Sequence, residues 1–136
     1  MHGAIQIHSE ILTALLEQAR KDPQKECCGL LAGRGGVIMC AFPATNVADN
    51  TAKAYEIGPE ELFRVMRKIR MAGLELLGIF HSHPAGENRP SAHDIERAYY
   101  PAAVYFIVSL QSDAPQPIRA FSIREGKVTE LEIQVV

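Results

Sequence analysis

The stretch FHSHP at residues 80–84 follows an apolar run, Leu74 to Phe80, and together they decide how the middle of the chain folds. The apolar run predicts a buried strand that continues directly into the histidines. Because side chains alternate along a strand, His81 and His83 point to the same side, where two imidazoles can share a metal ion. Pro84 is expected to end the strand and to leave both rings at an end of the sheet, open to a ligand.

A second group of polar residues begins ten positions after His81. Ser91 is a favourable helix N-cap, and Asp94 would lie in the first turn of the helix that it starts. A loop of this length can bring Asp94 back toward the histidines, and two nitrogens with one carboxylate oxygen suit Zn²⁺ and leave a fourth position for water. The same residues have an ordinary interpretation, since surface histidines and acidic residues at helix starts are common without a metal.

Outward from this segment, helices and strands are interspersed along the chain. Helical periodicity and end signals predict one helix behind Ser9 as N-cap up to Asp22-Pro23, one from Pro59 to Gly73, and one from Ser91 to about Tyr99. Apolar runs and turn residues predict the strands Ala4–Ile7, Cys28–Ala32, Val37–Phe42, Tyr55–Ile57, Val104–Leu110, Ile118–Ile123 and Val128–Val135. The expected class is α/β or α+β, with a mixed β-sheet flanked by about three helices in a single compact domain, residues 1–136.

Length and composition exclude several classes of protein. A chain of 136 residues suits one domain, and 47% hydrophobic with 22% charged residues is typical of a globular protein. A net charge of −2 argues against nucleic acid as a partner. The longest apolar stretch, residues 102–108, is too short to span a membrane. Three cysteines and an N-terminus without signal-peptide features predict a cytoplasmic protein.

Other reactive or aromatic residues have structural interpretations. Cys27 and Cys28 could be a nucleophile or a fourth zinc ligand, but we interpret them as small buried hydrophobic residues at the start of a strand. Tyr99 and Tyr100 are interpreted as packing residues rather than as a binding site.

The spacing of these motifs resembles a known family. His-Ser-His at residues 81–83, seven further residues and then Ser-x-x-Asp at 91–94 is similar to the signature of the JAMM (MPN-plus, JAB/Mov34-type) metallopeptidases. The upstream segment ECCGLLAG at residues 26–33 and Gly78 also fit this family. The resemblance implies a compact mixed-sheet domain of the JAMM/cytidine-deaminase-like type.

Roles for individual residues follow from this resemblance. It implies that one Zn²⁺ per chain is held by His81, His83 and Asp94. It also implies that Glu26 is the general base and that Ser91 donates a hydrogen bond to the oxyanion. Residue chemistry alone does not choose Glu26 over three other glutamates, namely Glu56, Glu75 and Glu87.

The resemblance further implies a substrate class. Stand-alone bacterial and archaeal domains of this size resemble peptidases or isopeptidases that cut after the C-terminal Gly-Gly of a small ubiquitin-like sulfur carrier protein, including the CysO-cysteine type. Glu87 and Arg89 lie in the loop between the ligand groups and are candidates for contacts with substrate. The alternative is a non-catalytic MPN-like module that binds proteins. A zinc deaminase is disfavoured because no Cys-x-x-Cys occurs, and the oligomeric state is open.

Overall fold

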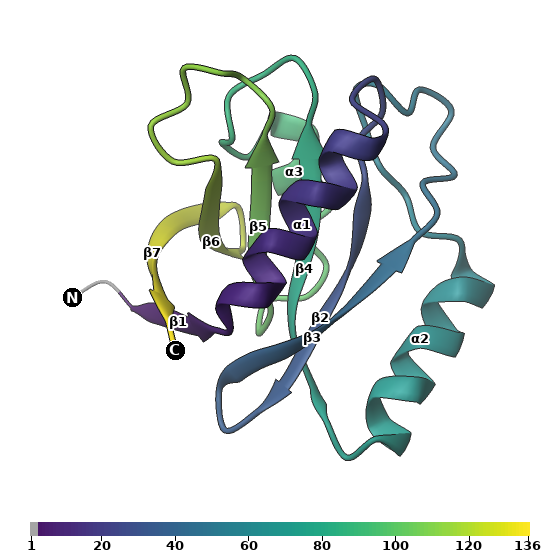
Figure 1. Ribbon diagram of the computed structural model, residues 1–136. Coiled ribbons are helices and arrows are strands. Elements are labelled where there is room, and N and C mark those ends of the chain that lie inside the picture. The colour runs from purple at the N-terminus through teal and green to yellow at the C-terminus, as the bar shows by residue number, and fades with distance from the viewer. Residues whose placement is uncertain (1–2) are drawn as a thin grey trace.

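Seven strands and three helices lie within residues 3–136, the part of the chain that the computed structural model describes (Figure 1). The helices are α1 (Ser9–Lys21), α2 (Pro59–Met71) and α3 (Ala92–Glu96). The strands are β1 (Ala4–Ile7), β2 (Cys28–Arg34), β3 (Val37–Ala44), β4 (Glu75–His83), β5 (Val104–Ser109), β6 (Ile118–Arg124) and β7 (Lys127–Val135). These elements confirm the predicted α+β class with three helices.

All seven strands belong to one closed barrel in the order β1-β3-β2-β4-β5-β6-β7. The sheet is mixed, as predicted, because β1 runs parallel to β3 and β7, and β4 runs parallel to β5. Closure of the sheet was not predicted. It depends on pairs such as Ile5 with Ile133, which lie at opposite ends of the chain and leave no local sequence pattern.

Two hairpins appear where turn residues predicted them. The turn between β2 and β3 has positive φ at both Gly35 and Gly36, the backbone of a type I′ turn, which glycine adopts without strain. The turn between β6 and β7 has positive φ at Glu125 and Gly126. These turns hold the antiparallel neighbours of the barrel in register.

Hydrophobic side chains pack on both faces of the central strands, with α1 against one face and α2 against the other. Alternation along β4 sends Phe80 to the α1 face and Ile79 to the α2 face. Because His81 is two residues from Ile79 on the same strand, the α2 face is also the face of the predicted metal ligands. Ser82, like Phe80, points to the opposite face.

Three sequence-based predictions were wrong in detail. Ser9 is the first residue of α1, and the N-cap is His8, whose carbonyl accepts the bond from Ile11 N. The third helix ends at Glu96 rather than near Tyr99, because the backbone of its C-cap residue Arg97 (φ −96°, ψ 14°) has left the helical conformation.

The predicted strand at residues 55–57 was also wrong. Ile57 forms only an isolated bridge with Asn46. The Asn46 side chain replaces a partner strand, because its amide nitrogen donates to the Ala54 carbonyl and its oxygen accepts from Glu56 N. A side chain that bonds to backbone groups in this way favours a loop over a sheet ladder.

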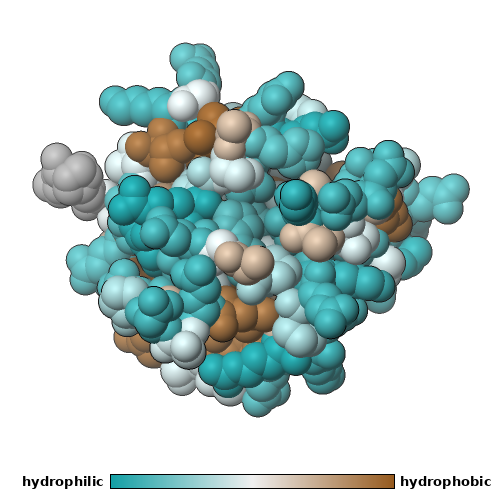
Figure 2. All heavy atoms as spheres, turned by 90° about the horizontal axis from the view of Figure 1, so that it is seen from above, coloured by the Kyte–Doolittle hydropathy of each residue, from teal (hydrophilic) through white to brown (hydrophobic). Residues whose placement is uncertain are grey.

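Hydrophilic side chains dominate the face seen in Figure 2, where hydrophobic side chains form small separate patches. A broad apolar area would be typical of a docking face for a large partner. Among residues 3–136, no helix combines the length and the hydrophobicity that a bilayer crossing requires.

Candidate active site

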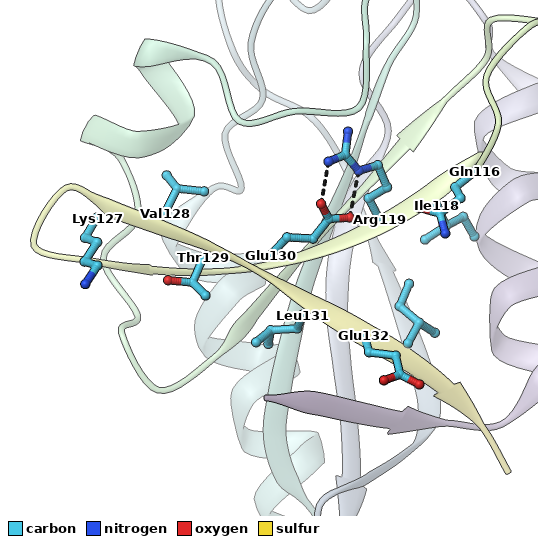
Figure 3. A pocket seen from close by; sticks show the side chains of 10 residues that line it. Gln116, Ile118, Arg119, Lys127, Val128, Thr129, Glu130, Leu131 and Glu132 are labelled. Atoms are coloured by element: carbon cyan, nitrogen blue, oxygen red, sulfur yellow. Dashed lines mark hydrogen bonds and ion pairs between the residues drawn. The ribbon is translucent and has the colours of Figure 1, made fainter. Parts of the chain in front are cut away.

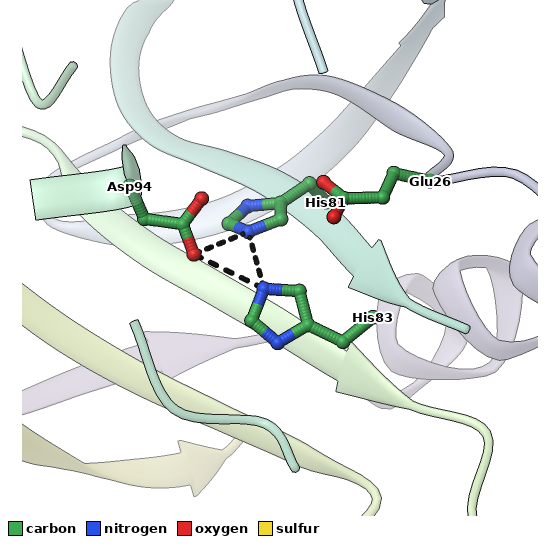
Figure 4. A group of neighbouring side chains, drawn as sticks. All are labelled: Glu26, His81, His83 and Asp94. Atoms are coloured by element: carbon green, nitrogen blue, oxygen red, sulfur yellow. Dashed lines mark hydrogen bonds and ion pairs between the residues drawn. The ribbon is translucent and has the colours of Figure 1, made fainter. Parts of the chain in front are cut away.

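The end of β4 brings two potential ligand atoms together with a third from α3 (Figure 4). His81 and His83 point to one side of the strand, and their Nε2 atoms are 3.1 Å apart. Oδ2 of Asp94 lies 3.1 Å from Nε2 of His81 and 3.0 Å from Nε2 of His83. The three atoms therefore form a nearly equilateral triangle, even though Asp94 comes from a different element.

A hydrogen bond at Nδ1 of His83 determines whether its other ring nitrogen, Nε2, presents a lone pair to the centre. Nδ1 of His83 lies 2.7 Å from the Glu87 carbonyl oxygen, which can only accept, so Nδ1 carries the proton. The Nε2 atom of the neutral ring then presents a lone pair toward a carboxylate oxygen. Two acceptors at 3.0 Å need a proton or a cation between them.

Hydrogen bonds at the N-terminus of α3 fix the position of the Asp94 side chain. Ser91 caps α3 by accepting a hydrogen bond from Asp94 N at 3.1 Å, and Ser91 N donates to Oδ2 of Asp94 at 2.9 Å. This capping box fixes the carboxylate where it faces the histidines. The Ser91 hydroxyl accepts in this bond, so its own proton remains free to be donated elsewhere.

Glu26 enters the same centre from the segment before β2. Its side chain is buried, and Oε1 has no hydrogen-bond partner among the described residues. One ligand atom from each of Glu26, His81, His83 and Asp94 lies within 4.8 Å of the others. An unpaired buried carboxylate oxygen is costly unless another group satisfies it, so it indicates a ligand or water in this space.

Backbone contacts hold Glu26 in place. Glu26 N donates to the Thr51 carbonyl, and the Asn46 side chain donates to the Glu26 carbonyl. The next residue, Cys27, donates from its N to Oγ of Ser82 at 2.8 Å. The segment before β2 is thereby tied both to β4 and to the loop that Asn46 organises.

Close packing of β2 against β4 supports this arrangement. Cys28 pairs with His81 across the two strands. At Gly29, a Cβ atom would lie 2.6 Å from ring carbons of Phe80 and would collide with the Phe42 carbonyl, so only glycine permits this approach. Close packing of β2 against its neighbours therefore requires glycine at the last position of the ECCG motif.

The electrostatics are those of a crowded buried cluster. Burial raises the pKa of Glu26 to about 8, with the charge of His83 lowering it and that of Asp94 raising it. Burial opposes ionisation of Asp94, but hydrogen bonds from His81 and His83 outweigh it and hold the pKa of that carboxyl well below its usual range. Burial lowers the pKa of His81, so its neutral form is favoured.

His83 behaves differently from His81. Burial acts to lower its pKa, but the hydrogen bonds with Asp94 and with the Glu87 carbonyl prevail and raise it. A divalent cation in the centre would reverse this balance, because it favours a neutral imidazole and an ionised Glu26.

The donor set fits a zinc ion. Zinc at about 2.0–2.1 Å from nitrogen and oxygen ligands gives a tetrahedral face with edges of about 3.3 Å. The edges of 3.0–3.1 Å between the three ligand atoms are close to that value. Three protein ligands with a fourth position facing a carboxylate are typical of catalytic rather than structural zinc sites.

The remaining candidates lie outside the cluster. Glu87 and Arg89 are exposed and pair with each other at 3.6 Å, and only the Glu87 backbone takes part through His83. Glu56 and Glu75 are exposed, so burial separates Glu26 from its alternatives. Cys28 is fully buried, as predicted, whereas Cys27 is half-buried; among the groups that the structure describes, neither belongs to the candidate metal-binding cluster.

Sequence reasoning missed three residues that build the site. Tyr55 stacks on the ring of His81, with ring centroids 4.4 Å apart. Ser82 and Asn46 hold the Glu26 segment by the bonds described above. A serine between two histidines and an asparagine in a polar stretch carry no recognisable signal, and Tyr55 was assigned to a strand.

A barrel with two histidines, an aspartate and a buried glutamate at one strand end defines a metallohydrolase type of centre. Comparison with known families gives the finer assignment. Residues 8–124 match the model of the prokaryotic homologues of the JAB domain, so the chain belongs to that family.

Named relatives in this family are peptidases. The chain is 41% identical over 108 residues to the desampylase of Haloferax volcanii, covering 78% of each protein. It is 33% identical over 132 residues to the CysO-cysteine peptidase of Mycobacterium tuberculosis, covering 96% of the chain and 90% of the relative. The solution structure of protein DSY2949 from Desulfitobacterium hafniense is 32% identical and matches with a TM-score of 0.85, covering 97% of this chain and 92% of the other.

These similarities confirm the predicted family. They also make the chain an enzyme, a hydrolase of the JAMM metalloprotease class.

Proposed function

We propose that the chain is a zinc-dependent peptidase or isopeptidase that hydrolyses the bond after the C-terminal Gly-Gly of a small ubiquitin-like sulfur carrier protein. The observation that carries this proposal is the unpaired, buried Glu26 oxygen in a cluster where one ligand atom each from Glu26, His81, His83 and Asp94 lies within 4.8 Å of the others. The names of the relatives, which include a desampylase and a CysO-cysteine peptidase, support the substrate class.

In the proposed mechanism His81, His83 and Asp94 hold one zinc ion. When bound there, zinc supplies Lewis-acid polarisation and lowers the pKa of water to about 7. A carboxylate oxygen of Glu26 accepts a proton from the attacking water. Glu26 then passes this proton to the nitrogen of the leaving amine. Its burial, which raises its affinity for a proton, suits a group that accepts a proton and then returns it.

Ser91 has a separate role in this proposal. Its hydroxyl proton is free while its oxygen caps α3, so it can donate to the carbonyl oxygen as negative charge develops there. Glu87 and Arg89 extend from the loop between the ligand residues, and their exposure suits contacts with the substrate protein. Neither side chain is needed to hold the ion.

The test uses purified protein and carrier proteins extended beyond Gly-Gly by a short peptide or joined through Gly-Gly to a lysine. Mass spectrometry should show release of the carrier ending in Gly-Gly, loss of this activity with a chelator, and its return with Zn²⁺. A zinc-replete protein that leaves every such bond intact would contradict the proposal and favour a non-catalytic binding module.

A further inference from the structure

A pocket of about 260 Å³ lies beside the candidate active site and takes no part in the mechanism above. Its buried floor comes from Leu30, Ile79 and Tyr105, which are at most 4% exposed. The Tyr105 hydroxyl is fixed by a hydrogen bond from Tyr100 N. The floor is therefore rigid and apolar, as in binding pockets for apolar groups.

The pocket becomes more exposed and more polar toward its mouth. Its walls include the half-buried side chains of Tyr55, Leu62 and Tyr100. At the rim, Glu56 and Arg97 lie 4.0 Å apart and are each about half exposed. An apolar floor under a polar, charged rim accepts an apolar side chain whose backbone remains in water.

The floor, one wall and the rim of the pocket each include a residue that adjoins the candidate catalytic centre. Tyr55 forms one wall and stacks on His81 with its ring. Ile79 precedes His81 by two residues on the same face of β4. Arg97 follows Asp94 by three residues at the end of α3. A group in this pocket would lie next to a substrate in the centre.

The distance along β4 suggests which substrate residue could enter. Two residues of a strand span about 6.6 Å, so the floor at Ile79 lies about that far from His81 along β4. In an extended tail that ends in Gly-Gly, the first side chain upstream of the scissile bond belongs to the residue before the glycine pair, two positions from the last glycine. The pocket floor at Ile79 is two residues from His81 along β4, and this side chain is two residues from the last glycine along the substrate. The two separations therefore match.

We infer that the pocket is a specificity subsite for a bulky apolar side chain at the residue immediately before Gly-Gly. This inference rests on the proposed function, because it assigns part of the same substrate to a neighbouring cavity. Tyr55 is shared by the subsite and the metal centre, so an occupied pocket would also pack against the residue that supports His81.

The first experiment changes only the substrate. Carriers with the tail X-Gly-Gly and one fixed extension are cleaved by the zinc-loaded protein, with X being Leu, Ala or Asp. The inference predicts a kcat/KM for Leu at least about tenfold above that for Ala, with Asp lowest, as expected when an apolar pocket is left unfilled. A parallel series varies the residue after the bond, which should have a smaller effect.

The second experiment fills the pocket. Leu62→Trp should reduce the Leu-to-Ala ratio of kcat/KM toward one. Phe63→Trp is the matched control, because Phe63 is the next residue of α2, is 66% exposed and does not line the pocket. If Leu62→Trp does not fold, Leu62→Ala should shift the preference from Leu toward Phe.

Outcomes separate the inference from the proposed function. Cleavage of all X-Gly-Gly tails with equal kcat/KM, or selectivity only at the residue after the bond, would overturn the subsite and leave the function intact. If no tail is cleaved, the proposed function fails, and calorimetry with free X-Gly-Gly peptides decides the subsite. Binding at least about tenfold tighter for Leu than for Ala would support it, and equal or absent binding would overturn it.

Discussion

Charged groups are paired in a surface groove of the barrel but left partly unpaired in the candidate catalytic centre. A groove of about 740 Å³ runs along β6 and β7 (Figure 3). There Arg119 and Glu130 point at each other and form two hydrogen bonds, of 2.9 and 2.6 Å. In the centre, by contrast, Glu26 and His81 each keep a buried atom without a partner among the described residues.

This contrast shows that the volume of a cavity alone is a poor guide to a functional site. Arg119 and Glu130 satisfy one another and remain partly in water, so this pair gains little from a ligand. In the centre, two imidazoles and two carboxyl groups converge in a buried space and leave atoms of Glu26 and His81 without a partner among the described residues, which a cation and water would complete. Experiments that alter the two regions separately should therefore give very different results.

Loss of a metal ligand should have the largest effect. Asp94→Ala removes one of the three proposed ligands and the capping box of α3. Zinc affinity should fall more than about 100-fold, because the loss of a residue that only supports a ligand typically costs about 10–100-fold. Metal content and cleavage should both approach zero. Glu96→Ala on the same helix is the control and should keep both. A variant of Asp94 that still holds one zinc ion would contradict the ligand assignment.

Loss of the proposed base, Glu26, should lower the rate of cleavage without changing the zinc content. Glu26→Gln keeps the shape of the buried side chain and should lower kcat by about 10²–10⁴-fold. Zinc content, measured on the same sample, should be unchanged. Glu75→Gln, at the far end of β4, should behave as the unmodified protein. Unchanged turnover by zinc-replete Glu26→Gln would rule out this residue as the base.

Two variants can separate the capping role of Ser91 from its proposed catalytic role. Ser91→Ala should cost about 1 kcal/mol of stability through the lost N-cap, whereas Ser91→Gly should cost only a few tenths. Both lack the hydroxyl, so both should lower kcat by about 100-fold or more. Urea unfolding and steady-state kinetics measure the two effects. Full activity of Ser91→Gly would show that Ser91 only caps the helix.

The groove should give the smallest effect. Arg119→Ala breaks a pair whose side chains are 20% and 43% exposed, and such pairs contribute about 0–1 kcal/mol. Thermal unfolding should shift little, and cleavage should not change. A large loss of activity with an intact fold would mean that the groove contacts the substrate, and the contrast between the two regions would no longer hold.

The sequence predicted those parts of the site that depend on local rules. Alternation along β4 places His81 and His83 on one face, and an N-cap followed by three residues places Asp94 in the first turn of α3. The hairpin turns and the ends of α2 follow from glycine and proline in the same way. Each of these rules acts within a few residues.

Features that depend on distant contacts could not be predicted. Residue chemistry alone could not separate Glu26 from Glu56 and Glu75, because the burial that distinguishes it is a property of the folded chain; only the family resemblance pointed to Glu26. Tyr99 was interpreted as a packing residue but is 68% exposed and lines the pocket with Tyr100. Closure of the barrel by β1 likewise joins the two ends of the chain.

X-ray absorption at the zinc edge of the zinc-loaded protein tests the central claim most directly. The account predicts four light ligands at about 2.0–2.1 Å, with the multiple-scattering pattern of two imidazoles and no sulfur. A shell at about 2.3 Å would place a cysteine thiolate on the metal, and Cys27 or Cys28 would then have to replace a ligand named here. Such a shell, or the absence of imidazole scattering, would contradict the account.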